Sequence, residues 1–186
     1  MNRFLLASLG LLLVLTACSE DNGTNPPITP QGPRGLYILN EGNFQRGNAT
    51  LSFYIPDSNI VYNDLFESVN GRPLGDVGNS ITVHDGLAYL VINNSHKIEV
   101  IDAATHKAVR TVASPAGASP RQIAFATNGY GFISNLLDNS VSVYNPSTGA
   151  LDDRIPVGAN PDGIAAAGNV VVVANSGFGA GSTVSL

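Results

Sequence analysis

The central part of the chain contains one sequence unit twice, and this repeat restricts the possible folds more than any other feature. Residues 89–102 read as a strand, a polar turn and a second strand in which apolar and polar side chains alternate. The pattern returns 43 positions later, where Phe132 stands in the place of Tyr89 and Val141 in the place of Ile98. We therefore interpret the chain as a repeat protein built from β-hairpins.

A second pair of matching segments gives the length of the repeat. Residues 119–124 (SPRQIA) return 41 positions later as residues 160–165 (NPDGIA), each time before an apolar run. A period near 40 residues, made of short strands and turns without a helical pattern, is typical of a β-propeller blade. We predict an all-β fold, a β-propeller of four-stranded blades, with about three and a half blades in residues 35–186.

The predicted blades differ in length. The second and third blades are expected at about residues 79–111 and 120–155, and the fourth begins at residue 161. The first blade is longer, and long loops on a rigid scaffold often form binding surfaces. Its expected parts are strands at residues 35–40, 49–54 and 60–63, followed by a polar loop at residues 64–78.

This number of blades does not complete a ring, because propellers close with about four to eight blades. An open series of blades leaves unpaired strand edges, which closure would protect. We therefore expect the chain to be a fragment of a longer protein or a truncated gene product.

Residues 1–17 have the pattern of a lipoprotein signal peptide. A short cationic start precedes an apolar run from Phe4 to Leu15, which is too short to span a bilayer as a helix of about 20 residues. Small residues precede Cys18, as in the bacterial lipobox, and the sequence has no second cysteine for a disulfide. We predict that Cys18 is lipidated and anchors the protein in a membrane.

Residues 18–34 are rich in proline and polar residues, which predicts a disordered tether. Ser19 rather than aspartate follows the cysteine, and this argues against retention in the inner membrane. The sequence Ser19-Glu20-Asp21 is similar to the acidic signal that sends lipoproteins to the cell surface in Bacteroidetes-type bacteria. The predicted location is the outer membrane, at the cell surface, with its periplasmic face as the alternative.

The charge pattern excludes nucleic acid as an expected partner. The chain has 9 basic and 14 acidic residues, for a net charge of −5, and the basic residues form no stripe.

No residue pattern indicates catalysis, a cofactor or a metal site. His84, His96 and His106 lie 12 and 10 positions apart, which is not the spacing of a metal-binding pair, and we expect them in solvated turns. No serine stands in a nucleophile elbow. We therefore expect a binding protein rather than an enzyme, although further blades could carry a catalytic site.

The candidate ligand-binding residues recur at the junctions between strands. Such junctions gather on one face of a propeller. Asparagine and proline are also the residues that tight turns require, so part of this recurrence has a structural explanation. Arg121 and Asp162 stand out because equivalent sites carry opposite charges that a turn does not require, and Phe44 is the best candidate for stacking. The predicted set is Asn40, Glu41, Phe44, Asn93, Asn94, Arg121, Asn135, Asp162 and Asn175.

The repeats resemble those of the YVTN-type, YncE-like bacterial propellers. The matching elements are Val141-Ser-Val-Tyr-Asn145, a Thr-Gly turn at Thr148 and Gly149, and the segment from Ile155 to Ala165. Residues 39–44 and 74–80 are similar to the N-terminal blades of a surface lipoprotein branch of Bacteroidetes. The resemblance covers residues 35–186, about half of a full member.

That branch includes a propeller that captures cobalamin and passes it to a TonB-dependent outer-membrane transporter. The resemblance implies a surface protein that binds a small molecule, with cobalamin and such a transporter as possible partners. The alternative is a non-catalytic envelope scaffold, or a propeller for adhesion or protein interaction. No residue identifies the ligand, because loops rather than the scaffold select it.

Overall fold

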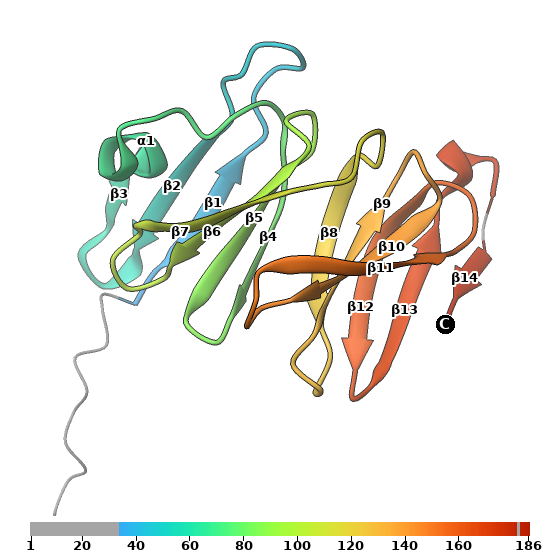
Figure 1. Ribbon diagram of the computed structural model, residues 1–186. Coiled ribbons are helices and arrows are strands. Elements are labelled where there is room, and N and C mark those ends of the chain that lie inside the picture. The colour runs from blue at the N-terminus through green and yellow to red at the C-terminus, as the bar shows by residue number, and fades with distance from the viewer. Residues whose placement is uncertain (1–33, 182) are drawn as a thin grey trace, which may run out of the picture. The chain divides into compact units, whose positions relative to one another are not determined.

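The computed structural model describes residues 34–181 and 183–186. These residues form four antiparallel sheets, numbered here sheet 1 to sheet 4 in chain order, and in each sheet consecutive strands pair (Figure 1). Within the described part of the chain, no helix has the length and apolar character needed to cross a membrane. The predicted signal peptide, Cys18 and the tether up to residue 33 lie outside the described residues.

Sheets 2 and 3 each have four strands, which confirms the predicted blades. Sheet 2 consists of β4 (Gly78–His84), β5 (Leu87–Ile92), β6 (Lys97–Asp102) and β7 (Ala108–Ala113). Sheet 3 consists of β8 (Pro120–Phe125), β9 (Gly131–Asn135), β10 (Ser140–Asn145) and β11 (Ala150–Pro156). The repeat extends to the backbone, because His96 and Asn139 occupy equivalent turns with left-handed φ angles of 49° and 54°.

Sheets 1 and 4 have three strands each in the described residues. Sheet 1 consists of β1 (Leu36–Asn40), β2 (Thr50–Ile55) and β3 (Ile60–Tyr62), with a 3-10 turn, η1 (Pro56–Ser58), between the last two. Sheet 4 consists of β12 (Pro161–Ala167), β13 (Val170–Asn175) and β14 (Thr183–Ser185), with η2 (Gly177–Gly179) before β14. β1 corresponds to the second strand of the other sheets, because Asn40 ends β1 as Asn135 ends β9.

The segment after sheet 1 contains a helix, which corrects the prediction of a polar loop without helical structure. α1 (Leu65–Asn70) buries Leu65 and Phe66, and Gly71 ends it with a left-handed φ of 67° and a hydrogen bond to the carbonyl of Glu67. Six residues are fewer than two helical turns, so the sequence could not show a 3.6-residue period. The helix forms because its two apolar residues complete a core between sheets 1 and 2.

Sheet 2 is packed on both faces. On one face, Leu90 and Ile101 pack with Leu51 and Phe53 of sheet 1. On the other face, Tyr89 belongs to a second core that includes residues of sheet 3. Because consecutive side chains of a strand point to opposite faces, neighbouring residues of β5 serve different cores, and its apolar run is continuous rather than alternating.

Candidate functional site

The predicted site residues gather at one end of the sheets. The turn after β5 hydrogen-bonds to the connection that leads into β4, through Asn93 N and Val77 O at 2.8 Å. The same bond recurs in sheet 3 between Leu136 N and Ser119 O, and in sheet 4 between Ser176 N and Asn160 O. We call this end of the sheets the loop end (Figure 1). It comprises residues 40–49, 77–80, 93–96, 114–122, 135–139, 157–163 and 175–181.

Each first strand begins with an irregularity in its pairing. The register shifts between Gly78 and Ser80 in β4, between Pro120 and Ile123 in β8, and in the same way at the start of β12. Such bulges re-aim side chains and are frequent beside functional sites. The second residues of these three strands are Asn79, Arg121 and Asp162, so Arg121 and Asp162 lie inside strands rather than at the predicted junctions between strands.

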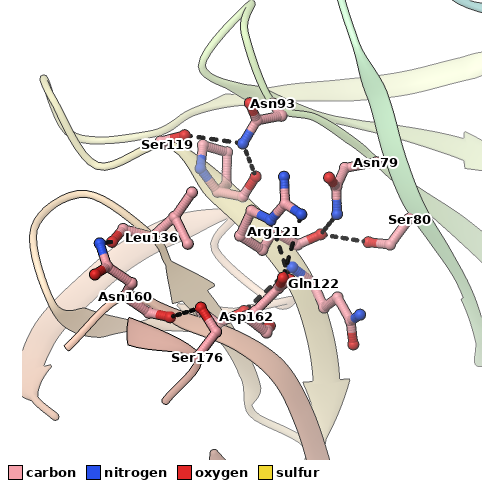
Figure 2. Close-up of polar contacts among 12 residues, drawn as sticks. Asn79, Ser80, Asn93, Ser119, Arg121, Gln122, Leu136, Asn160, Asp162 and Ser176 are labelled. Carbon is pink, nitrogen blue, oxygen red and sulfur yellow. Dashed lines mark hydrogen bonds and ion pairs between the residues drawn. The ribbon is translucent and has the colours of Figure 1, made fainter. Parts of the chain in front are cut away.

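Arg121 and Asp162 form an ion pair between sheets 3 and 4. Arg121 Nε lies 3.0 Å from Asp162 Oδ1, and Nη2 lies 3.3 Å from Oδ2 (Figure 2). Both side chains are partly open to solvent, with exposed fractions of 25% and 35%. Arg121 and Asp162 occupy equivalent positions of the repeat, each in the first strand of its sheet. The opposite charges that the sequence shows at these positions therefore lie next to each other in the structure.

Side chains of one sheet bind the backbone of the next along the first strands. Asn79 Nδ2 and Ser80 Oγ both donate to the carbonyl of Arg121, at 2.7 and 2.8 Å. Asn93 donates to the carbonyl of Pro120 at 2.8 Å and to the Ser119 hydroxyl at 2.9 Å. These bonds fix the backbone on which Arg121 is carried (Figure 2).

Three of the predicted asparagines share one structural role. Asn135 Nδ2 donates to the hydroxyls of Ser140 and Ser142, at 3.1 and 2.9 Å. Asn175 makes the same pair of bonds to Thr183 and Ser185, and Asn40 makes it to Thr50 and Ser52. Asn135 and Asn175 are buried, so we assign them to strand pairing alone. Asn40 makes the same bonds but is exposed, and its ligand-binding role stays a prediction.

Sheet 2 replaces this asparagine and its two hydroxyl partners with a charged cluster that sequence reasoning missed. Ile92, Lys97 and Glu99 stand in the places of Asn135, Ser140 and Ser142. Glu99 is fully buried and accepts hydrogen bonds from Lys97, Arg72 and Thr111. The 43-residue offset between Glu99 and Ser142 is the signal that could have revealed it.

The pKa of Glu99 reflects two opposed effects. Burial raises the pKa, but the hydrogen bonds from Arg72, Lys97 and Thr111 outweigh burial and lower the pKa below the usual 4.5. Arg72 also lies over the ring of Phe66, 4.9 Å from its centroid. The cluster therefore joins the α1 segment to sheet 2.

The other predicted residues of the loop end have different surroundings. Asn94 Nδ2 donates to Asp76 Oδ2 at 2.6 Å. The backbone carbonyl of Glu41 accepts from Gly78 N at 3.0 Å, and the Glu41 side chain is exposed. Phe44 is 66% exposed in the connection between β1 and β2, so it is available to a ligand, and its binding role stays a prediction.

Two of the three histidines pack against aromatic rings, which corrects the expectation of solvated turns. His84 stacks on Phe125 with centroids 4.1 Å apart, and His106 Nδ1 lies 2.7 Å from the Tyr37 hydroxyl. Burial lowers the pKa of His106 below its usual 6.5, against the opposing charge of Asp102. In residues 34–181 and 183–186, no three His, Cys, Asp or Glu side chains form a group suited to a metal ion.

Comparison with known proteins identifies one matching family and several structures with a similar fold. A family model described as "Domain of unknown function (DUF5074)" matches residues 34–181. None of the curated proteins compared with the chain matches it.

Several solved structures are similar to the chain. For a streptogramin B lyase structure the identity is 16% and the TM-score 0.56, over 78% of this chain and 52% of that chain. A putative 6-phosphogluconolactonase from Bacteroides uniformis is 20% identical with a TM-score of 0.53, and the match covers 75% of this chain and 44% of that chain. Hydrazine synthase from Kuenenia stuttgartiensis is 27% identical with a TM-score of 0.51, and the match covers 54% of this chain and 29% of that chain.

The chain thus spans about half or less of each of these chains. Such similarity shows the fold alone, and it confirms the predicted β-propeller class, of which the described residues form part.

Proposed function

The chain belongs to the family described as "Domain of unknown function (DUF5074)", and we propose that it is a non-catalytic propeller segment that binds a small molecule at its loop end. The observation that carries this proposal is the Arg121–Asp162 pair. The bulged first strands bring together two partly exposed charged side chains that neither a turn nor a core requires. Exposed charged pairs add only about 0.2–1 kcal/mol to stability, so a binding role explains the pair better than stability does.

A more specific part of the proposal concerns where the protein is located and which ligand it binds. The sequence pattern around Cys18 supports a lipoprotein of the outer membrane, held at the cell surface by its lipid. The resemblance of the repeats to the YVTN-type surface branch supports capture of a cobalamin-like molecule for a TonB-dependent transporter. The mixed charge of the Arg121–Asp162 pair suits a ligand that carries both hydrogen-bond donors and acceptors, as amide-rich compounds do.

The test measures binding of cyanocobalamin to the purified full chain by isothermal titration calorimetry. Arg121→Ala is expected to weaken binding about tenfold or more, because it removes hydrogen bonds from a charged donor. Lys107→Ala is the control, since it removes a cation from the exposed turn between β6 and β7, outside the loop end. Equal affinity of the wild type and both variants would contradict the proposed site.

The alternative function is a non-catalytic scaffold or adhesion propeller in the envelope. Exposed apolar side chains on strands of sheets 1 and 4 favour it, among them Ile38, Val61 and Val184. If cyanocobalamin does not bind and one envelope protein copurifies in a defined ratio, this alternative replaces the capture function.

A further inference from the structure

One position of the repeat is buried in three sheets and exposed in sheet 1. This position lies two residues before the end of the second strand, and its residues in sheets 1 to 4 are Ile38, Leu90, Ile133 and Val173. The last three side chains are 0%, 1% and 3% exposed, whereas Ile38 is 44% exposed. Leu90 belongs to the core between sheets 1 and 2, so this position faces the preceding sheet. We call the side of sheet 1 that carries Ile38 the Ile38 face.

A position of the third strand shows the opposite pattern. It is the second residue of that strand, and its residues in sheets 1 to 4 are Leu51, Ile98, Val141 and Val184. The first three side chains are 0%, 1% and 2% exposed, whereas Val184 is 63% exposed. Ile98 belongs to the core that includes residues of sheet 3, so this position faces the following sheet. We call the side of sheet 4 that carries Val184 the Val184 face.

These two positions meet wherever two sheets of the chain pack together. Between neighbouring sheets, a third-strand residue of the earlier sheet shares a core or a hollow with a second-strand residue of the later sheet. The three pairs are Leu51 with Leu90, Ile98 with Ile133, and Val141 with Val173. Val184 and Ile38 have no such neighbour in the described part of the chain, because they lie on the two end sheets (Figure 1).

The two exposed faces have complementary shapes. A shallow hollow on the Val184 face is lined by uncharged residues, several of them small, including Gly163, Ala165 and Ala174. On the Ile38 face, Leu36 lies two positions before Ile38, on the same side of β1, and is 58% exposed. Large apolar side chains of one face can therefore enter the hollow of the other, and their burial removes apolar surface from water.

We propose that the Val184 face binds the Ile38 face of a second copy of this chain, in a head-to-tail contact. A second copy is the partner because its Ile38 face carries the aliphatic residue that fills this position in all three contacts within the chain. Each copy has one face of each kind, so two copies make the contact twice and close a ring. Such a ring contains eight sheets, four from each copy, and closed propellers have about four to eight.

This assembly accounts for the apolar side chains that sheets 1 and 4 expose. Monomeric proteins rarely leave large contiguous apolar patches uncovered, and such patches mark protein interfaces. The inference concerns assembly and does not depend on small-molecule binding at the loop end.

The experiment is sedimentation velocity of the purified full chain at several concentrations up to about 100 μM. The wild type is expected to sediment as a species of two copies. Ile38→Asp and Val184→Asp are each expected to weaken this association about tenfold or more, because either change places an unpaired carboxylate in both contacts of the ring. Val109→Asp is the matched control, since Val109 is 54% exposed on β7 of sheet 2 and should leave the association unchanged. Circular dichroism checks that all three variants keep the β fold.

An equal mixture of the two end-face variants tests the head-to-tail geometry. In a mixed pair, one contact joins the intact Val184 face of the Ile38→Asp chain to the intact Ile38 face of the Val184→Asp chain. The mixture is therefore expected to associate at concentrations at which each variant alone is monomeric. A contact between two identical faces would instead be lost in one variant and kept in the other.

The inference is overturned if the wild type is monomeric at about 100 μM, if only one of the two end-face variants loses association, or if their mixture stays monomeric. Masses that continue to rise above two copies with concentration would overturn the closed ring, because a head-to-tail contact that does not close builds an open filament.

Discussion

Arg72 donates two hydrogen bonds to the carboxylate of Glu99, at 2.8 and 2.9 Å, and so ties the segment after α1 to a fully buried charge in sheet 2. In the other sheets the position of Glu99 holds a serine that bonds to an asparagine. One blade thus exchanges a neutral network for an ionic one. The hydrogen bonds from Arg72 to Glu99 connect sheet 2 to the segment that follows sheet 1, and the other repeats have no equivalent of this segment.

Removal of Arg72 is expected to destabilise the fold. Arg72→Met should lower the free energy of unfolding by about 1–3 kcal/mol, less than the full cost of breaking a buried pair, because Lys97 and Thr111 still bond to Glu99. Urea unfolding followed by circular dichroism measures the change. Arg154→Met is the control, since its partner Asp138 is 16% exposed whereas Glu99 is fully buried, and this pair should contribute less than about 1 kcal/mol. Equal effects would contradict this account.

The asparagines that end the second strands should differ in importance according to burial. Asn135→Ala leaves the hydroxyls of Ser140 and Ser142 without this donor in a buried site, and should cost about 1–3 kcal/mol. Asn40→Ala removes the same two-bond motif at an exposed residue, where water replaces it, and should cost less than about 1 kcal/mol. Thermal unfolding of both variants tests the difference. A larger loss for Asn40→Ala would refute the role of burial.

Acid should weaken the contact between sheets 1 and 2 through His106. Its pKa is lowered in the folded protein because burial disfavours the charged imidazole, so the unfolded chain binds the proton more readily. The stabilising contribution is complete above the usual pKa of 6.5 and declines as the pH falls below it. Unfolding measured from pH 8 to pH 5.5 should show this decline.

His106→Asn is the comparison for the acid experiment, because asparagine accepts the left-handed φ of 60° and does not titrate. The variant should lack the decline between pH 6.5 and pH 5.5. An identical pH dependence in both proteins would show that another group is responsible.

Alkali should destabilise the fold through two phenols, those of the partly buried Tyr37 and the buried Tyr89. Burial raises the pKa of both Tyr37 and Tyr89 to about 12. Unfolded tyrosine loses its proton near pH 10, so stability is complete below pH 10 and declines as the pH rises toward 12. Tyr89→Phe should reduce the decline, as measured by unfolding between pH 9 and pH 11. If this variant and the wild type decline alike, Tyr89 is not a source of the effect.

Much of the architecture follows from local sequence. Alternating apolar residues and turn residues predicted the hairpins β5–β6 and β9–β10, because strand period and turn chemistry are local properties. The turn before β7 is an example, since Asp102 Oδ1 accepts the N–H of Thr105 just as Asn145 Oδ1 accepts that of Thr148. The repeat also identified Arg121 and Asp162 as equivalent positions of opposite charge.

Only the tertiary structure decided how those positions are used. α1 forms because a core between two sheets accepts Leu65 and Phe66, and six residues are too few to show a helical period. Glu99 is a partner of Arg72 because the chain folds back over 27 positions, a contact that no local pattern encodes. The sequence determined the strands, turns and period, since these depend on neighbouring residues. Burial and the ion pair between Arg121 and Asp162 depend on sheets packing side by side, so they exist only in the folded protein.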